Sequence, residues 1–180
     1  MSEATPSTNG LAADHEREPE NWEALARRAA RRSGEEADQQ ELVEFLTCDL
    51  AGAPYALPVD RVREIVRMRP LTSVPRTPDW LLGVITLRGE VVQVLDLRMC
   101  LGLPVSDLGR RTRIVVLHAE DGEVSGLLVD GVRSVLRTDE SAICASSLTD
   151  VGAVSEMCRN GDEFVSIVDL DHVLESHTDA

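Results

Sequence analysis

The chain has 180 residues with 32 acidic and 18 basic side chains, which gives a formal net charge of −14. This length allows one domain or two small ones. The negative net charge argues against sequence-independent binding to nucleic acid and against binding to an anionic membrane, since both require a basic face. All of the lysine and arginine positions are arginine, so a Schiff-base lysine and a phosphate-loop lysine are excluded.

The cysteines and the apolar stretches indicate no special compartment or metal chemistry. The four cysteines are far apart in the sequence and form no C-x-x-C pair, so they predict neither a metal site nor a disulfide framework: Cys48, Cys100, Cys144 and Cys158. The N-terminus carries no apolar stretch of signal-peptide length, and no run approaches the ~18 apolar residues of a membrane span. We therefore expect a soluble, cytoplasmic protein without a metal or cofactor.

Residues 1–40 differ in composition from the rest of the chain and predict a flexible N-terminal extension. Residues 1–21 are rich in Ser, Thr, Pro, Ala and Glu, a composition typical of disorder. Trp22 to Arg32 has apolar side chains at helical spacing and arginines on the other side, which favours a short helix that docks on a partner or on the body. Because its apolar face is mostly alanine, a marginal helix on a flexible tail fits the sequence as well.

The body begins near Glu41 with a predicted hairpin. Leu42 to Leu50 and Pro54 to Pro58 read as strands joined at Ala51-Gly52. Val59 to Val66 has valines at helical spacing and fits either a helical turn or a strand. Three prolines then indicate an irregular connection: Pro70, Pro75 and Pro78.

A second hairpin and a capped helix follow. Trp80 to Leu87 and Val91 to Leu95 are apolar runs separated by Arg88-Gly89-Glu90, which predicts a hairpin turned by Gly89. Asp96 is placed to cap a short helix that runs through Leu101.

The order of elements then repeats. At an offset of 70 residues, Phe45 lies over Val115 and Asp60 over Asp130; at an offset of 73, Val91–Leu97 lies over Phe164–Leu170. The second copy predicts strands at 114–118, 124–129, 132–136, 154–158 and 164–168, with an Asp169-capped helix to Leu174. Many short strands with glycine-bearing turns are typical of barrels or sandwiches, and the repeat predicts two small barrels packed side by side.

We find no reacting constellation in the sequence. The four histidines are scattered, with His15 and His177 in expected tails, and no nucleophile, zinc or nucleotide motif occurs. Asp96 and Asp169 form an imaginable acid/base pair, but their equivalent places in the repeat favour two helix caps. The unusual polar feature is Arg88, which either forks onto a partner's carboxylate or carbonyl groups or is a solvated turn arginine.

Three segments together resemble the CheW-type chemotaxis coupling proteins. Gly83 to Arg98, GVITLRGEVVQVLDLR, resembles the family pattern G-V-x-N-L-R-G-x-V-V-P-V-x-D-L-R. The segments Tyr55–Ile65 and Gly126–Leu136 are similar to its flanking segments, in the same order and spacing, and the resemblance spans about Leu42 to Glu175. The sequence departs at Thr86, where Asn is usual, and at Gln93, where Pro is usual; neither change threatens the fold.

The resemblance implies a mainly β fold with two SH3-like five-stranded β-barrels in tandem and short helices. It also implies a non-catalytic adaptor that bridges methyl-accepting chemoreceptor tips to the regulatory domain of a CheA-type histidine kinase, in cytoplasmic arrays at the membrane. The matching positions predict a receptor-binding site at Arg88 and Gly89 with Val62 and Glu64; Asp130 and Val132 match in the second barrel.

These expectations divide the chain into an extension (1–40), a CheW-like domain of two related subdomains (41–176) and a short tail (177–180). We expect the free chain to be a monomer. Three other functions compete with the adaptor: a kinase-independent scaffold or decoy on the same fold, a small hydrolase built on Asp96, Asp130 and Asp169, and a β-barrel reader of RNA. The absence of a catalytic motif counts against the hydrolase, and the negative charge and few aromatics count against the RNA reader.

Overall fold

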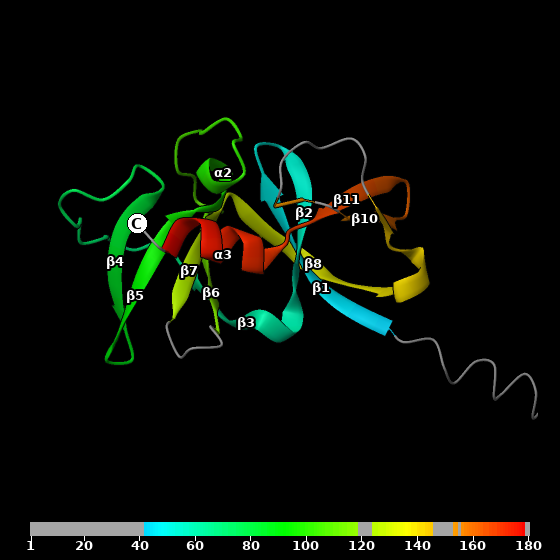
Figure 1. Cartoon of the computed structure of the whole chain (residues 1–180), viewed down its shortest axis with the longest axis horizontal. Helices are drawn as coiled ribbons and strands as arrows, with labels where there is room; N and C mark the ends of the chain where they lie inside the picture. Colours follow the sequence, from blue (N-terminus) through cyan, green and yellow to red (C-terminus); the bar gives the residue numbers. More distant parts are fainter. Residues whose placement is uncertain (1–41, 119–123, 146–152, 155, 179–180) are drawn as a thin grey trace, which may run out of the picture. The chain divides into compact units, whose positions relative to one another are not determined.

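The computed structural model describes residues 42–118, 124–145, 153–154 and 156–178. Within these ranges the fold is mainly β with few helices, as predicted (Figure 1). The helix predicted at 22–32 lies outside the described residues. Where the structure describes the chain, its helices are too short and too polar to cross a bilayer.

The strands follow the predicted order in both copies. The first copy contains β1 (Leu42–Leu50), β2 (Ala53–Pro58), β3 (Val62–Arg67), β4 (Leu81–Leu87), β5 (Glu90–Asp96) and helix α2 (Leu97–Cys100). The second contains β6 (Arg113–Leu117), β7 (Ser125–Val129), β8 (Gly131–Asp139), β9 (Cys144–Ala145), β10 (Glu156–Asn160), β11 (Glu163–Ile167) and helix α3 (Leu170–Thr178). Single turns of 3-10 helix stand at Val59–Arg61 (η1) and Glu140–Ala142 (η2), so the ambiguous Val59 to Val66 stretch is a turn followed by a strand.

The two copies exchange their first hairpins. One sheet has the order β8-β1-β2-β11-β10-β9 and the other the order β3-β6-β7-β5-β4. Each copy's opening hairpin therefore joins the later strands of the other copy. Corresponding strands hold corresponding places, which confirms the repeat. The predicted mainly β fold of two related units is confirmed; each unit combines strands of both copies, and the two-residue β9 adds a sixth strand to one sheet.

Three apolar clusters follow from the alternation of side chains along the strands. One cluster lies within the sheet of order β3-β6-β7-β5-β4 and contains Ile114, Val116 and Leu128. A second lies within the other sheet around Phe45 and Val165. The neighbours that point the opposite way form the largest cluster, between the sheets: Leu46, Cys48, Leu50, Val115, Leu117, Leu127 and Val129.

Helix α3 covers this central cluster and extends beyond its predicted end. Val173 is fully buried there, and Arg61 of η1 binds the carboxylate of Asp171 at 2.7 Å. His177, expected in a tail, is instead helical, and its ring meets Trp80 edge-on with centroids 5.0 Å apart. The helix runs to Thr178 because its apolar face has the central cluster to pack on.

Equivalent ion pairs close both sheets. Arg63 on edge strand β3 binds Glu90 on β5 at 2.6 Å. At the matching places in the repeat, Arg133 on edge strand β8 binds Glu163 on β11 at 2.8 Å. Each pair draws an edge strand to the hairpin at the far side of its own sheet, so the sheet curls on itself as a barrel does.

Candidate functional site

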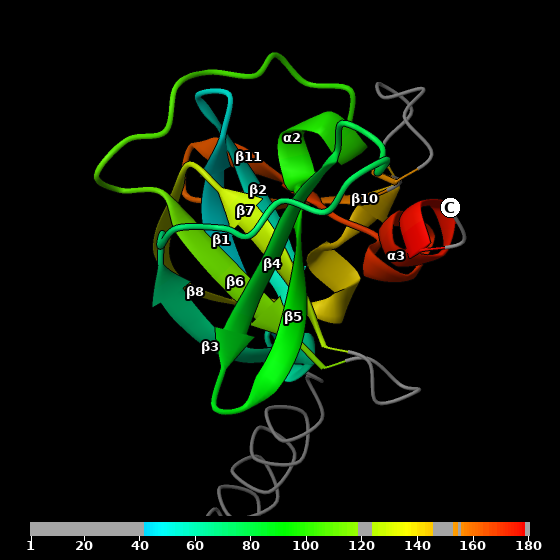
Figure 2. The ribbon, with the colours of Figure 1, turned by 90° about the vertical axis from the view of Figure 1, so that its left-hand side faces the viewer.

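The predicted hairpin tip is a two-residue turn made by Arg88 and Gly89. Leu87 of β4 pairs with Glu90 of β5, and the φ angles of Arg88 and Gly89 are 53° and 89°. Two consecutive positive φ angles are the signature of the type I′ turn, whose twist matches that of the flanking strands. The prediction that Gly89 turns this hairpin is confirmed, and the turn projects at one end of strands β4 and β5 (Figure 2).

Arg88 is exposed and held by one carboxylate. Its Nη2 donates to Glu64 Oε2 on β3 at 3.1 Å, with the two side chains 70% and 20% exposed. The neighbouring Arg63–Glu90 pair crosses the same gap between β3 and the hairpin. We name these four residues the hairpin cluster: Arg63, Glu64, Arg88 and Glu90.

The hairpin cluster leaves hydrogen-bonding capacity unused. A guanidinium has five N–H donors, and Arg88 commits one of its nitrogens to Glu64. On the other side of the pair, Glu64 Oε1 is buried and accepts no hydrogen bond from the described residues. Because the Arg88 side chain is exposed, its remaining donors can bind acceptors of a second molecule at the tip of the barrel.

The structure does not bring all six predicted residues together. β5 and β7 run parallel, with Gln93 beside Ser125 and Asp96 beside Leu128. Asp130 follows the end of β7, so it lies at the opposite end of this sheet from the hairpin tip. Val132 pairs with Cys48 in the other sheet. Val62, Glu64, Arg88 and Gly89 lie at the same end of one sheet, and the two second-copy residues lie elsewhere.

The valines contribute to the core more than to an exposed surface. Val62 and its repeat equivalent Val132 are half-buried and pack against the central cluster. Val62 stands at a bulge in β3, where the pairing with β6 shifts between Val62 and Glu64. The bulge turns the strand at the point where it approaches the hairpin, so Val62 helps to set the position of Glu64.

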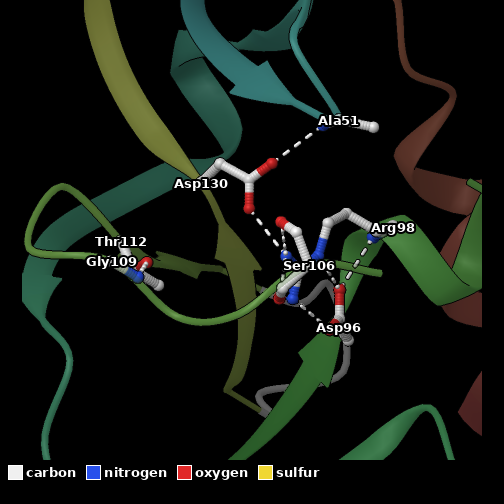
Figure 3. Close-up of polar contacts among 7 residues, drawn as sticks. All are labelled: Ala51, Asp96, Arg98, Ser106, Gly109, Thr112 and Asp130. Carbon is white, nitrogen blue, oxygen red and sulfur yellow. Dashed lines mark hydrogen bonds and ion pairs between the residues drawn. The ribbon is translucent and has the colours of Figure 1, made fainter. Parts of the chain in front are cut away.

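A second polar cluster, centred on Arg98, is absent from the sequence predictions. Arg98 is 1% exposed, and it donates from Nε and Nη2 to the two oxygens of Asp96 at 2.9 and 2.7 Å (Figure 3). Its Nη1 donates to Asp130 Oδ1 at 2.8 Å and to the carbonyl oxygen of Ser106 at 3.0 Å. We name these four residues the Arg98 network.

The Arg98 network ties the two sheets together. Asp130 Oδ2 accepts a hydrogen bond of 2.8 Å from the backbone N–H of Ala51, in the β1–β2 turn of the other sheet. The hydrogen bonds that Arg98 donates to Asp96, followed by the charges of Asp96 and Asp130, raise the pKa of Arg98 against the opposing effect of burial. Asp130 is thus an internal link, which explains why it is not part of the hairpin cluster.

The predicted helix caps are confirmed. Asp96 Oδ1 accepts from the backbone N–H of Arg98 at 3.0 Å, and Asp169 Oδ1 accepts from that of His172 at 3.0 Å. A capping carboxylate two residues before an arginine was the signal that could have found the Arg98 network. The sequence alone does not show that the arginine turns inward.

The motif departures fit the fold. Gln93 donates from Nε2 to Ser125 Oγ at 3.4 Å across the β5–β7 pairing, and β5 is continuous through this position. Thr86 is exposed on β4. Gly83 is required where it stands, because a Cβ there would lie 2.4 Å from the carbonyl oxygen of Thr72.

The comparisons with known proteins agree with these features. The model of the CheW-like domain family matches residues 44–178. The chemotaxis protein CheW of Bacillus subtilis is 33% identical over 132 residues, which are 71% of this chain and 83% of that protein. The Helicobacter pylori CheW is 28% identical over 141 residues, 77% of this chain and 85% of that protein. The crystal structure of the scaffolding protein TtCheW from Thermoanaerobacter tengcongensis superposes with a TM-score of 0.69 at 26% identity, covering 76% of this chain and 90% of that one. The chain therefore belongs to the CheW-like family, as its motifs predict.

Proposed function

We propose that this chain is a non-catalytic adaptor that couples chemoreceptors to a CheA-type histidine kinase in membrane-associated arrays. Its relatives are chemotaxis proteins, and the similar solved structure is a scaffolding protein. The single observation that carries the proposal is the hairpin cluster, which presents an exposed arginine on a rigid type I′ turn.

The hairpin cluster is the proposed receptor-binding site. Arg88 would donate hydrogen bonds to carboxylate or carbonyl groups of the receptor tip, since a guanidinium can bind a carboxylate with two parallel hydrogen bonds. Glu64 orients Arg88 through its Oε2 atom, while Gly89 and Val62 shape the turn and the strand behind it. Asp130 and Val132 are left out of this site because their side chains serve internal contacts.

Exposed apolar side chains on β8 and β11 are the proposed kinase contacts. Val135 and Phe164 are 52% and 62% exposed on the β8–β11 barrel, and their repeat equivalents Ile65 and Val91 are 42% and 68% exposed. In each barrel the pair flanks the closing Arg–Glu ion pair. An apolar pair with a polar neighbour suits the core and rim of a moderate interface. Because Ile65 and Val91 flank the hairpin cluster, which we assign to the receptor, we propose that the kinase's regulatory domain binds at Val135 and Phe164.

Two calorimetric titrations test this assignment: one with the kinase's regulatory domain and one with a receptor-tip fragment. We expect Arg88→Ala to weaken receptor binding about tenfold or more while kinase binding changes less than about twofold. Phe164→Ser should do the reverse, and Arg159→Ala, an exposed arginine outside the hairpin cluster, serves as the control for the receptor arm. If the folded chain binds receptor fragments but not the kinase domain, the coupling role is wrong and the kinase-independent scaffold or decoy replaces it.

A further inference from the structure

Five arginines gather where β3 ends and β6 begins. Arg67 closes β3 and Arg69 follows it, while Arg110, Arg111 and Arg113 lead into β6. We name these five residues the basic patch. The segment that enters β6 runs beside the end of β3 (Figure 2), and the strand pairing joins the two directly. The patch stands out in a chain whose formal net charge is −14.

The strand register places like charges face to face. Arg67 and Arg113 are direct partners across the antiparallel β3–β6 pair. Side chains directly opposite one another lie close together, and like charges in such a pair are destabilising. Among the described residues, the hydrogen bonds of Arg113 go to carbonyl groups: its Nη1 donates to the carbonyl oxygens of Arg110 and Thr112 at 3.0 and 2.8 Å.

The basic patch is also poorly neutralised. Arg61, Arg63, Arg88, Arg98, Arg133, Arg137 and Arg159 each have a carboxylate within 3.8 Å. In the part of the chain that the structure describes, no such ion pair is found for Arg67, Arg69, Arg110 or Arg113. Arg111 lies 4.0 Å from Asp49, with its side chain 84% exposed, and that carboxylate already accepts from Arg133 at 2.6 Å. Acidic residues outnumber basic ones in the chain, so a shortage of carboxylates does not explain the patch.

We propose that the basic patch docks a carboxylate-rich segment of a partner protein. Guanidinium groups match carboxylates with paired hydrogen bonds, and four of these five arginines have no ion pair with a carboxylate among the described residues. Two exposed apolar residues stand in the same approach to β6: Val105 is 56% exposed and Leu108 is 50% exposed. A segment that combines carboxylates with a few apolar side chains therefore fits this surface best.

The chain's net charge favours a short protein segment over a long polyanion. The Debye length is ~8 Å at physiological ionic strength. A short segment is therefore attracted by the nearby arginines more strongly than it is repelled by acidic side chains farther away. A nucleic acid or an anionic bilayer would extend past the patch and meet the acidic remainder of the protein, which repels it.

The basic patch is separate from the hairpin cluster. Arg113 pairs with Val129 at the end of β7, whereas the hairpin tip lies at the beginning of β5, which runs parallel to β7. The two sites therefore occupy opposite ends of the same sheet. An acidic partner at the patch and a receptor at the hairpin cluster could bind at once, so this inference stands independently of the proposed function.

Fluorescence anisotropy on the full chain tests the proposal. The probe is a short labelled peptide of glutamates interrupted by leucines, and its control carries glutamines in place of the glutamates. We expect saturable binding of the glutamate peptide alone, weakened about tenfold or more by Arg67→Gln with Arg110→Gln and weakened further by added salt. The melting temperature of this double variant should not fall, because Arg67→Gln removes the repulsion with Arg113.

The matched control is Arg137→Gln with Arg159→Gln, which removes the same charge from exposed sites outside the patch and should change binding less than about twofold. Equal weakening by both double variants would mean that net charge alone drives binding, and the patch would not be a site. Absence of saturable peptide binding would overturn the proposal. So would tighter binding of single-stranded RNA or of phosphatidylserine vesicles than of the peptide, since the partner would then be a polyanion or a membrane.

Discussion

The Arg98 network and the hairpin cluster use the same chemistry in opposite environments. In the Arg98 network, the side chain of Arg98 is 1% exposed and binds two carboxylates. In the hairpin cluster, the side chain of Arg88 is 70% exposed and binds one carboxylate. A buried charge without partners is very costly, whereas an exposed ion pair contributes ~0–1 kcal/mol. The comparison teaches that burial decides whether an arginine maintains the fold or is free to recognise a partner.

Replacement of Arg98 should give the largest effect. Arg98→Leu leaves the carboxylates of Asp96 and Asp130 facing each other without their shared cation, so we expect a loss of about 3–5 kcal/mol in the free energy of unfolding. Urea denaturation followed by circular dichroism measures it. Arg98→Lys keeps the charge but not the fork of donors and should lose less. A loss below about 1 kcal/mol in Arg98→Leu would show that the network does not hold the sheets together.

Replacement of Asp130 should give a smaller loss, because this residue is partly exposed and has a second role. Asp130→Asn keeps an oxygen for the Ala51 N–H but removes one charge from Arg98, so we expect a loss of about 1.5–3 kcal/mol. Receptor binding should not change beyond the effect of stability, since Asp130 lies at the other end of the sheet from Arg88. A selective loss of receptor affinity in a fully folded Asp130→Asn protein would return this residue to the receptor-binding site.

Substitutions at Gly89 in the hairpin turn should change the free energy of unfolding only through backbone strain. Gly89 has φ at 89°, and a Cβ placed there meets nothing within 4 Å. Gly89→Val should therefore reduce the free energy of unfolding by about 1–2 kcal/mol through left-handed strain alone. Gly89→Asn, which tolerates this conformation better, should reduce it less. An unchanged melting temperature for Gly89→Val would mean that the turn rearranges at no cost.

Local features of this fold were predictable from sequence, and long-range ones were not. The Arg88-Gly89 turn and the Asp96 and Asp169 caps depend on a few neighbouring residues, so their signals are local. The exchange of the opening hairpins was missed because the two copies have similar strands, and either pairing satisfies the same alternation of side chains. The burial of Arg98 was missed for a related reason: its partner Asp130 lies 32 positions away. Asp130 was predicted at the receptor site because position in a repeat does not reveal which sheet end a residue occupies.

Replacement of Arg88 should change stability least and recognition most. Arg88→Ala removes one exposed ion pair. It leaves the backbone strain of a non-glycine residue at positive φ little altered, so we expect the free energy of unfolding to change by less than about 1 kcal/mol. Receptor affinity should nevertheless fall, because the unused donors of Arg88 are the groups offered to the partner. Arg63→Gln is the matched variant within the same cluster: it removes the barrel-closing pair with Glu90 but leaves Arg88 on its turn. If Arg63→Gln and Arg88→Ala weaken receptor binding equally, the cluster acts through its overall charge, and the contrast between a fold-maintaining and a partner-recognising arginine would not extend to Arg88.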